Sequence, residues 1–544
     1  MGHFKSPRAL DDQPASWRTL PQKQQLLILT LCRLFDYMQV VSFQTVCYYQ
    51  LKSFDSTTSE QTLSWQAGVA SGVFSGAQIL TSMIWGRIAD ASWCGRKNVL
   101  LIGLMGTGFS CLGLAFSRSF NSVVGFRFMA GAFHVTIGTV RTIMSENTQE
   151  KKSVDLRVTK IQCDHCAYGS YRHQARAFLL LPAAVMVASI LGSVCASRLA
   201  DPFAIHPGIM DAASTYGSAS WVAWMKTFPY APPALMGAIS MVFIGLVASL
   251  TIEETLESRQ YRPNLAAAWR RDERSQAANI FPVYDALTSG LSTQDVEASL
   301  DEKRKSLDNE EPRSTRIIWK FTILVILFAQ AIFDFHMGGF DSLLPLFLST
   351  PRSSAAQRFP FVFSGGLGME PRKVATALTM VGCIGLALQF VFYPTINSRL
   401  GNVKTFRIFS IAFPVAYCLA PYLAIVPASQ PFAVWTLITL VLTIHTAGRI
   451  FVLPVTIALL NNCAADTSVL GTIHGLGQTT TAIFRTAGPV SAGSLFGASL
   501  ELGSIRIVWW VMAIIAMFGW VASLFVWESK SSTRAVAIEA VKMS

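Results

Sequence analysis

A small set of ionisable side chains lies inside long apolar segments of this sequence, where burying a charge is costly. A carboxyl group shielded from water can take up and release a proton near neutral pH, and histidine titrates in the same range. Buried guanidinium groups can hold a carboxylate or an anionic ligand. The set therefore predicts sites for protons, for anions or for both. Its members are Arg33, Asp36, Arg127, Asp334, His336, Arg449 and Arg485.

Each of these residues also has a simpler interpretation. Arg33 and Asp36 are three apart on one helix face and could pair only for packing. Arg127 is near the outer start of its segment, so its guanidinium could reach the membrane surface instead. His336 could be a structural histidine. Arg449 and Arg485 could bind an anionic group or pair with the aspartates, and Asp341 is expected nearer the outer surface.

Long apolar runs must position these residues. The chain has 544 residues, of which 51% are hydrophobic and only 14% charged. A helix needs roughly 20 apolar residues to cross a bilayer, and runs of that size recur along the chain. The sequence predicts an all-α polytopic membrane protein with twelve spans at 25–49, 65–88, 98–117, 122–144, 177–199, 231–252, 317–348 (with a break near Gly338 and Gly339), 374–396, 405–426, 432–460, 469–498 and 505–527.

The spans divide into two halves of six helices, residues 25–252 and 317–527. A charged linker at 253–316 joins the halves, and tails at 1–24 and 528–544 are expected to be cytoplasmic. The first tail has no short apolar core before a cleavage site, so we expect no cleaved signal peptide. Residues 153–173 form an unusual insertion in the loop between the fourth and fifth spans, either a weak Cys-x-x-Cys metal signal or a retained intron.

The net charge of +12 does not indicate nucleic-acid binding, because the basic residues concentrate in the linker and in short loops between apolar runs. That pattern follows the positive-inside rule and places both termini inside. No catalytic triad, zinc spacing or nucleotide fingerprint is present. We therefore expect a monomer in the lipid bilayer that is not an enzyme and needs no metal or cofactor.

The loop after the second span carries the most specific motif. It reads Gly86-Arg87-Ile88-Ala89-Asp90 and then Gly95-Arg96-Lys97, and it resembles the cytoplasmic signature of the major facilitator superfamily. Gly86 is expected to allow close helix approach, and Asp90 to face a helix N-terminus or an arginine. The resemblance implies a gating loop of Gly86, Asp90, Gly95, Arg96 and Lys97. The gap between Asp90 and Gly95 is longer than the family pattern.

Small residues at three further places extend the resemblance. Arg127 and Gly131 resemble an Arg-x-x-x-Gly element that the family associates with proton coupling. The fifth span keeps only Gly192 of the Gly-Pro-x-x-Gly-Gly pattern of drug:proton antiporters, whereas Gly488, Pro489 and Gly493 give a related shape in the eleventh span. We expect these glycines to serve helix packing. The chain resembles fungal antiporter-like members and plant zinc-induced facilitator-like members.

This resemblance implies a secondary transporter in which two halves rock around a central cavity. The first hypothesis is proton-driven efflux of a small organic molecule, such as a secondary metabolite or xenobiotic, across the plasma membrane or alternatively the vacuolar membrane. The alternatives are an importer or uniporter of a sugar, peptide or organic anion, and a membrane receptor or scaffold that transports nothing. The substrate and the coupling ion do not follow from the sequence.

Overall fold

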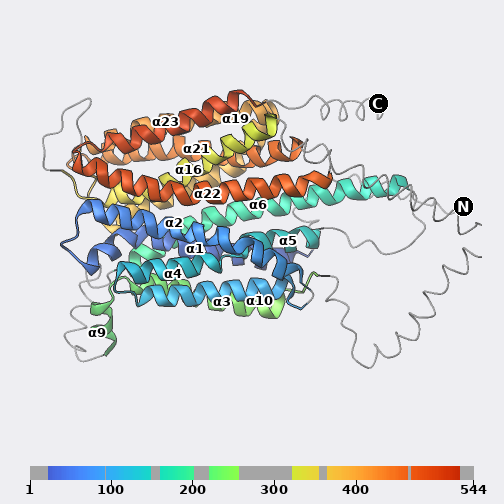
Figure 1. Cartoon of the computed structure of the whole chain (residues 1–544), viewed down its shortest axis with the longest axis horizontal. Coiled ribbons are helices and arrows are strands. Elements are labelled where there is room, and N and C mark those ends of the chain that lie inside the picture. Colours follow the sequence, from blue (N-terminus) through green and yellow to red (C-terminus); the bar gives the residue numbers. More distant parts are fainter. Residues whose placement is uncertain are drawn as a thin grey trace, which may run out of the picture.

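The computed structural model describes the chain over residues 22–91, 93–148, 160–200, 220–256, 321–353, 364–463 and 467–526. The two tails and most of the linker lie outside these residues. The described part is almost entirely helical, and two halves lie side by side: in Figure 1 the N-terminal half, blue to green, is below the C-terminal half, yellow to red. This arrangement confirms the predicted all-α fold.

The N-terminal half begins with α1 and ends with α10. Its helices are α1 (Lys23–Phe54), α2 (Glu60–Asp90), α3 (Gly95–Ala115), α4 (Phe120–Ala132), α5 (Thr136–Thr148), α6 (Lys160–Leu199), the short α9 (Ser220–Thr227) and α10 (Ala231–Thr251).

The C-terminal half begins with α16 and ends with α23. Its helices are α16 (Phe321–Ser349), α17 (Pro371–Ala387), the π-helix η2 (Leu388–Phe392), α18 (Tyr393–Leu400), α19 (Asn402–Ser410), α20 (Ala412–Leu419), the 3-10 helix η3 (Ala420–Ala424), α21 (Pro431–Cys463), α22 (Thr467–Glu501) and α23 (Arg506–Leu524).

Eleven segments of the described chain are long and apolar enough to cross a membrane. Each overlaps one of the predicted spans. The remaining predicted span, residues 469–498, lies within α22, which has 35 residues but a more polar sequence rich in glycine and threonine. The apolar segments show a multi-pass membrane protein, and α22 packs among them against α2 and α16.

Two helix interruptions differ from the prediction. The fourth span is broken at residues 133–135, between α4 and α5. The break is tolerated because its backbone is paired: the His134 N–H donates to the Gly131 carbonyl at 3.1 Å, and the Trp85 indole donates to the Ala132 carbonyl at 2.7 Å. The predicted break near Gly338 and Gly339 is wrong, because α16 is continuous there.

The two glycines of α16 serve packing instead of bending. A Cβ atom on Gly338 would lie 3.2 Å from the Arg485 carbonyl oxygen, and one on Gly339 would lie 3.4 Å from the Gly488 carbonyl oxygen. Glycine at these positions lets α16 and α22 approach closely. Of the predicted insertion at 153–173, residues 160–173 are helical, since α6 begins at Lys160 and continues to Leu199, and residues 153–159 lie outside the described residues.

Helices α2 and α22 bring the two halves into contact at one end of the bundle. We call this the far end, where α2 begins at Glu60 and α22 ends at Glu501; the opposite, linker end is where α2 ends at Asp90. At the far end, a Cβ atom on Gly68 would lie 2.6 Å from the Pro489 carbonyl oxygen and 3.1 Å from the Cα atom of Gly493. The α2 and α22 backbones are thus in direct contact there.

The same face of α2 separates from α22 toward the linker end. Gly86 lies about five helical turns beyond Gly68 on the same face of α2, and a Cβ atom there would meet nothing within 4 Å. On α22, Ile483 is 49% exposed. The α2 and α22 helices are therefore in contact toward the far end and parted at the linker end.

Candidate functional site

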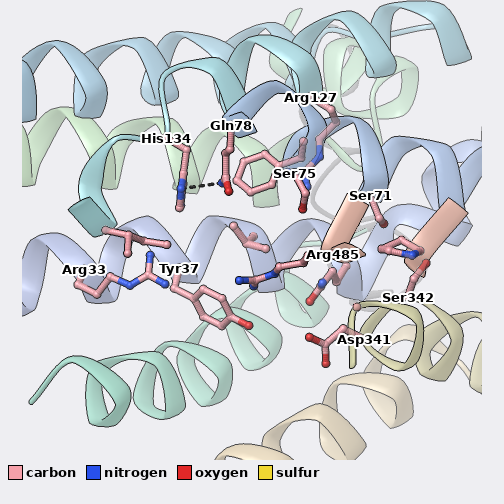
Figure 2. Close-up of a pocket in the computed structure, with 16 residues that line it drawn as sticks. Arg33, Tyr37, Ser71, Ser75, Gln78, Arg127, His134, Asp341, Ser342 and Arg485 are labelled. Atoms are coloured by element: carbon pink, nitrogen blue, oxygen red, sulfur yellow. Dashed lines mark hydrogen bonds between the residues drawn. The ribbon is translucent and has the colours of Figure 1, made fainter. Parts of the chain in front are cut away.

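A cavity lies between the two halves at the middle of the bundle. It is lined from the N-terminal half by α1, α2, α4 and the α4–α5 break, and from the C-terminal half by α16 and α22. Its enclosed volume is about 50 Å³, which holds a few water molecules and is smaller than an ordinary ligand pocket. Figure 2 shows the lining residues, with Arg33, Arg127, Asp341 and Arg485 among those labelled.

Arg33 and Asp36 form an ion pair beside this cavity. The Arg33 Nη1 atom donates to the Asp36 Oδ2 atom at 2.8 Å, as the spacing of three on α1 allows. Asp36 is fully buried and Arg33 is 8% exposed. A buried pair is costly to break because removal of one partner leaves the other charge uncompensated.

His134 joins this pair from the α4–α5 break. Its Nε2 atom lies 2.9 Å from the Asp36 Oδ2 atom, and its Nδ1 atom lies 2.8 Å from the Gln78 amide nitrogen (Figure 2). An amide nitrogen only donates, so Nδ1 accepts from Gln78 and the ring proton is on Nε2. Sequence reasoning missed His134, and its only signal was a histidine within an apolar span.

Arg127 is enclosed by aromatic rings. Its guanidinium lies 4.2 Å from the ring centre of Phe43 and 4.3 Å from that of Phe74, and its Nε atom donates to the Ala70 carbonyl at 3.3 Å. Arg127 is only 2% exposed, so its side chain does not reach the membrane surface. The Nη1 atom is buried without a hydrogen-bond partner, which leaves an unused donor at the cavity.

The C-terminal half supplies a second ion pair. Asp341 of α16 accepts from the Arg449 Nη1 atom at 3.0 Å, and Arg449 also hydrogen-bonds to Tyr37 of α1. Arg449 is therefore paired, one of the two alternatives for this residue. Asp341 also lines the cavity, in the part of α16 nearer its far-end terminus at Ser349.

Asp334 and Arg485 are neighbours that form no ion pair. Asp334, 7% exposed, lies one turn from the cavity wall and hydrogen-bonds to Thr481 of α22. Arg485 lines the cavity one turn further along α22. Among the described residues no carboxylate forms an ion pair with Arg485.

His336 lies apart from the cavity, in a buried aromatic cluster. Its Nδ1 atom is 2.9 Å from the Tyr417 hydroxyl, which is also 3.3 Å from the His445 Nε2 atom. The His445 ring stacks on Phe340 with ring centres 3.6 Å apart. Sequence reasoning did not find Tyr417 or His445, since they come from α20 and α21, far along the chain.

The loop after α2 is held by carboxylates from other elements. Arg96 contacts Asp90 at 3.4 Å and also pairs with Glu146 at the end of α5. Glu254, just after α10, accepts the backbone N–H groups of Arg96 at 3.1 Å and Lys97 at 3.2 Å. Glu254 thereby caps the N-terminus of α3.

Two glycines of this loop behave differently. Gly95 has a φ of 78°, a left-handed conformation that favours glycine, and it begins α3. Gly86 does not allow a close helix approach, contrary to expectation, because a Cβ atom there would meet nothing within 4 Å. The reason is that α2 has already separated from its neighbour at this end.

The small residues predicted for packing do lie at close contacts. A Cβ atom on Gly192 would lie 2.7 Å from the Met38 carbonyl oxygen, and one on Gly493 would lie 2.6 Å from the Ser64 carbonyl oxygen. Gly131 and Gly488 face carbonyl oxygens of Phe74 and Phe335 even more closely. Pro489 is inside α22, at the contact with α2.

The described part of the chain contains no cluster of side chains that could bind a metal ion. No group of three or more His, Cys, Asp or Glu side chains lies together there. The Cys163 and Cys166 side chains are outside the residues whose side chains are described.

Replacing Glu254 by Gln is expected to lower the stability of the loop by about 1 kcal/mol, as the loss of a helix cap does. The amide keeps the size of the side chain but loses the charge that faces the helix N-terminus. Thermal unfolding of the purified chain in detergent measures the effect, with Glu253→Gln on the exposed neighbour as control. Equal melting of the two variants would contradict the capping role.

Comparisons with known proteins agree with this architecture. The model of the Major Facilitator Superfamily matches residues 26–489. A major facilitator superfamily multidrug transporter of Aspergillus fumigatus is 27% identical over 97% of this chain and 88% of that protein. The Arabidopsis thaliana protein Zinc Induced Facilitator 1 is 21% identical over 89% of this chain and 87% of that protein.

The fold is also similar to that of a transporter of known structure. The crystal structure of a D-xylose–proton symporter has a TM-score of 0.58 to this chain at 14% identity, and the match covers 92% of this chain and 97% of that one. The family match begins in α1 and reaches Pro489 of α22. The chain therefore belongs to the major facilitator superfamily and is a membrane transporter.

Proposed function

We propose that this transporter is driven by protons and exports a small organic molecule by alternating access. The observation that carries the proposal is the Arg33–Asp36–His134 network, buried beside a cavity between two halves whose helices α2 and α22 meet toward the far end. A titratable group in that position can exchange a proton and change the balance between two conformations.

The geometry supports alternating access. By the positive-inside rule the linker end faces the cytoplasm, so the parted end of α2 and α22 is the cytoplasmic one. The cavity would then receive substrate from inside and widen as it binds. Rocking of the halves would break the Gly68–Gly493 contact and open the far end.

Proton binding is assigned to Asp36 in preference to Asp334. Asp36 has its Oδ2 atom shared between Arg33 and His134, whereas its buried Oδ1 atom has no hydrogen-bond partner. A proton on this carboxyl group would weaken its hold on Arg33 and His134 together. Because His134 belongs to the α4–α5 break, protonation would act on three helices at once and bias one conformation.

Export is supported by the similarity to a multidrug transporter. The test compares cells that carry the gene with cells that lack it, by mass spectrometry of medium and cytoplasm. We expect a set of small molecules enriched in the medium, and their transport by the purified chain in vesicles should follow an imposed pH gradient. Accumulation inside the cells would instead support an importer, and no change in any compound would support a scaffold.

The plasma membrane is the proposed location, because export to the medium requires it. A fluorescent fusion of the full chain should therefore outline the cell. A signal confined to the vacuolar membrane would assign the same transport to vacuolar loading.

A further inference from the structure

The charges around the cavity do not balance. Arg33 is taken up by Asp36, and Arg449 by Asp341. Arg127 and Arg485 remain, and neither forms an ion pair with a carboxylate among the described residues. With Asp334 counted beside Arg485, four guanidinium groups still face three carboxylates, so the site is positive.

The two arginines without an ion-pair partner line the same space. Arg127 is 2% exposed, and its Nη1 atom is buried without a hydrogen-bond partner. Arg485 comes from the opposite half and lies among Ser71, Ser75 and Ser342 (Figure 2). Burying a guanidinium without a counter-charge is costly, and a bound anion would offset that cost. Arginine also offers paired N–H groups that match a carboxylate.

One more arginine adds positive charge near Arg33. Arg141 is exposed on α5, one turn or more toward the linker end from the α4–α5 break, and it acts electrostatically on Arg33. A cationic substrate would be repelled by this group of arginines, whereas an anionic one would be attracted.

We propose that the transported molecule is a small organic anion whose carboxylate is held by Arg485 with Arg127. This inference rests on the proposed transport function and names its substrate class. It also fits export, because an inside-negative membrane potential drives a monovalent anion outward by about 50-fold for each 100 mV.

Two xanthene dyes of similar size and opposite charge test the proposal: fluorescein, an anion, and rhodamine 123, a cation. Cells that express the full chain should lose fluorescein faster than cells without it and should lose rhodamine 123 no faster. Arg485→Gln should slow fluorescein loss at least tenfold, as expected for a lost charge-assisted hydrogen bond. Arg485→Lys should retain part of the rate, because lysine keeps the positive charge but lacks the paired N–H donors of the guanidinium group.

A control separates this site from general surface charge. Arg118→Gln removes a positive charge that stacks on Phe228 at the far end, 4.7 Å from its ring centre, and it should leave fluorescein loss unchanged. Faster loss of rhodamine 123 in place of fluorescein would overturn the proposal, as would a normal fluorescein rate in Arg485→Gln.

A binding measurement separates failure of the anion site from failure of transport. Fluorescein should raise the melting temperature of the purified chain but not that of Arg485→Gln. Stabilisation without movement of either dye would support the anion site and contradict the exporter. Movement of rhodamine 123 without stabilisation by fluorescein would support a transporter and overturn the anion site. If fluorescein neither stabilises the chain nor is transported, the anion-site proposal is also overturned.

Discussion

Asp36→Asn is expected to reduce transport driven by a pH gradient to the background rate. Asparagine keeps the shape of the side chain but cannot take up a proton, so the network of Arg33 and His134 would no longer respond to pH. Flux of an identified substrate through the purified chain in vesicles, with and without an imposed pH gradient, measures this directly. Flux that still rises with the gradient as in the unmodified chain would exclude Asp36 as the coupling group.

The same substitution is expected to cost stability, which must be separated from the functional effect. It leaves the buried Arg33 guanidinium without its carboxylate, and breaking a buried pair in this way costs about 3–5 kcal/mol. The double variant Arg33→Gln with Asp36→Asn removes both charges and should recover most of the lost stability. It should still fail to respond to the gradient, which would show that the response needs the carboxyl group.

Gly68→Ala is expected to shift the chain away from the conformation that is closed at the far end. The added methyl carbon would lie 2.6 Å from the Pro489 carbonyl oxygen, and neither backbone can move aside unless α2 and α22 separate. Overpacking of this kind costs about 1–3 kcal/mol. Because the contact exists only when the far end is closed, the ratio of the two conformations should change by about 5- to 150-fold.

Spin labels on Thr62 and Leu502, two exposed residues at the far ends of α2 and α22, can report this change. Pulsed electron resonance should show a longer distance population in Gly68→Ala. Gly125→Ala is the matched control, since a Cβ atom at Gly125 would meet nothing within 4 Å. The same distance distribution in both variants would mean that α2 and α22 do not separate during transport.

The spans could be predicted from the sequence because the thickness of the bilayer fixes how long an apolar helix must be. The pair of Arg33 and Asp36 could be predicted for a similar reason, since three residues on a helix always bring two side chains onto one face. Both predictions use distances along one helix. No knowledge of the neighbouring helices is needed for either.

What failed depends on how separate helices lie against each other. His134 reaches Asp36 only because α4 and α5 part at residue 133, and no residue type in that stretch specifies a break. Gly338 and Gly339 illustrate the opposite error, because glycine allows both bending and close packing, and the choice is made by α22. Gly86 lies on the same face of α2 as Gly68, which contacts α22. Whether α22 also reaches Gly86 depends on which ends of α2 and α22 are in contact.

The length of α6 gives the molecule a mechanical property. The predicted fifth span begins at residue 177, whereas α6 begins at Lys160, so the same helix continues for about 25 Å before that span. Figure 1 shows this extension reaching past the neighbouring helices. Within the membrane α6 packs on α1 of its own half and on α17 of the other. A tilt of α6 by about 20° would therefore move the N-terminal end of this extension by roughly 10 Å. A fluorescent label attached there could record that movement at every transport cycle.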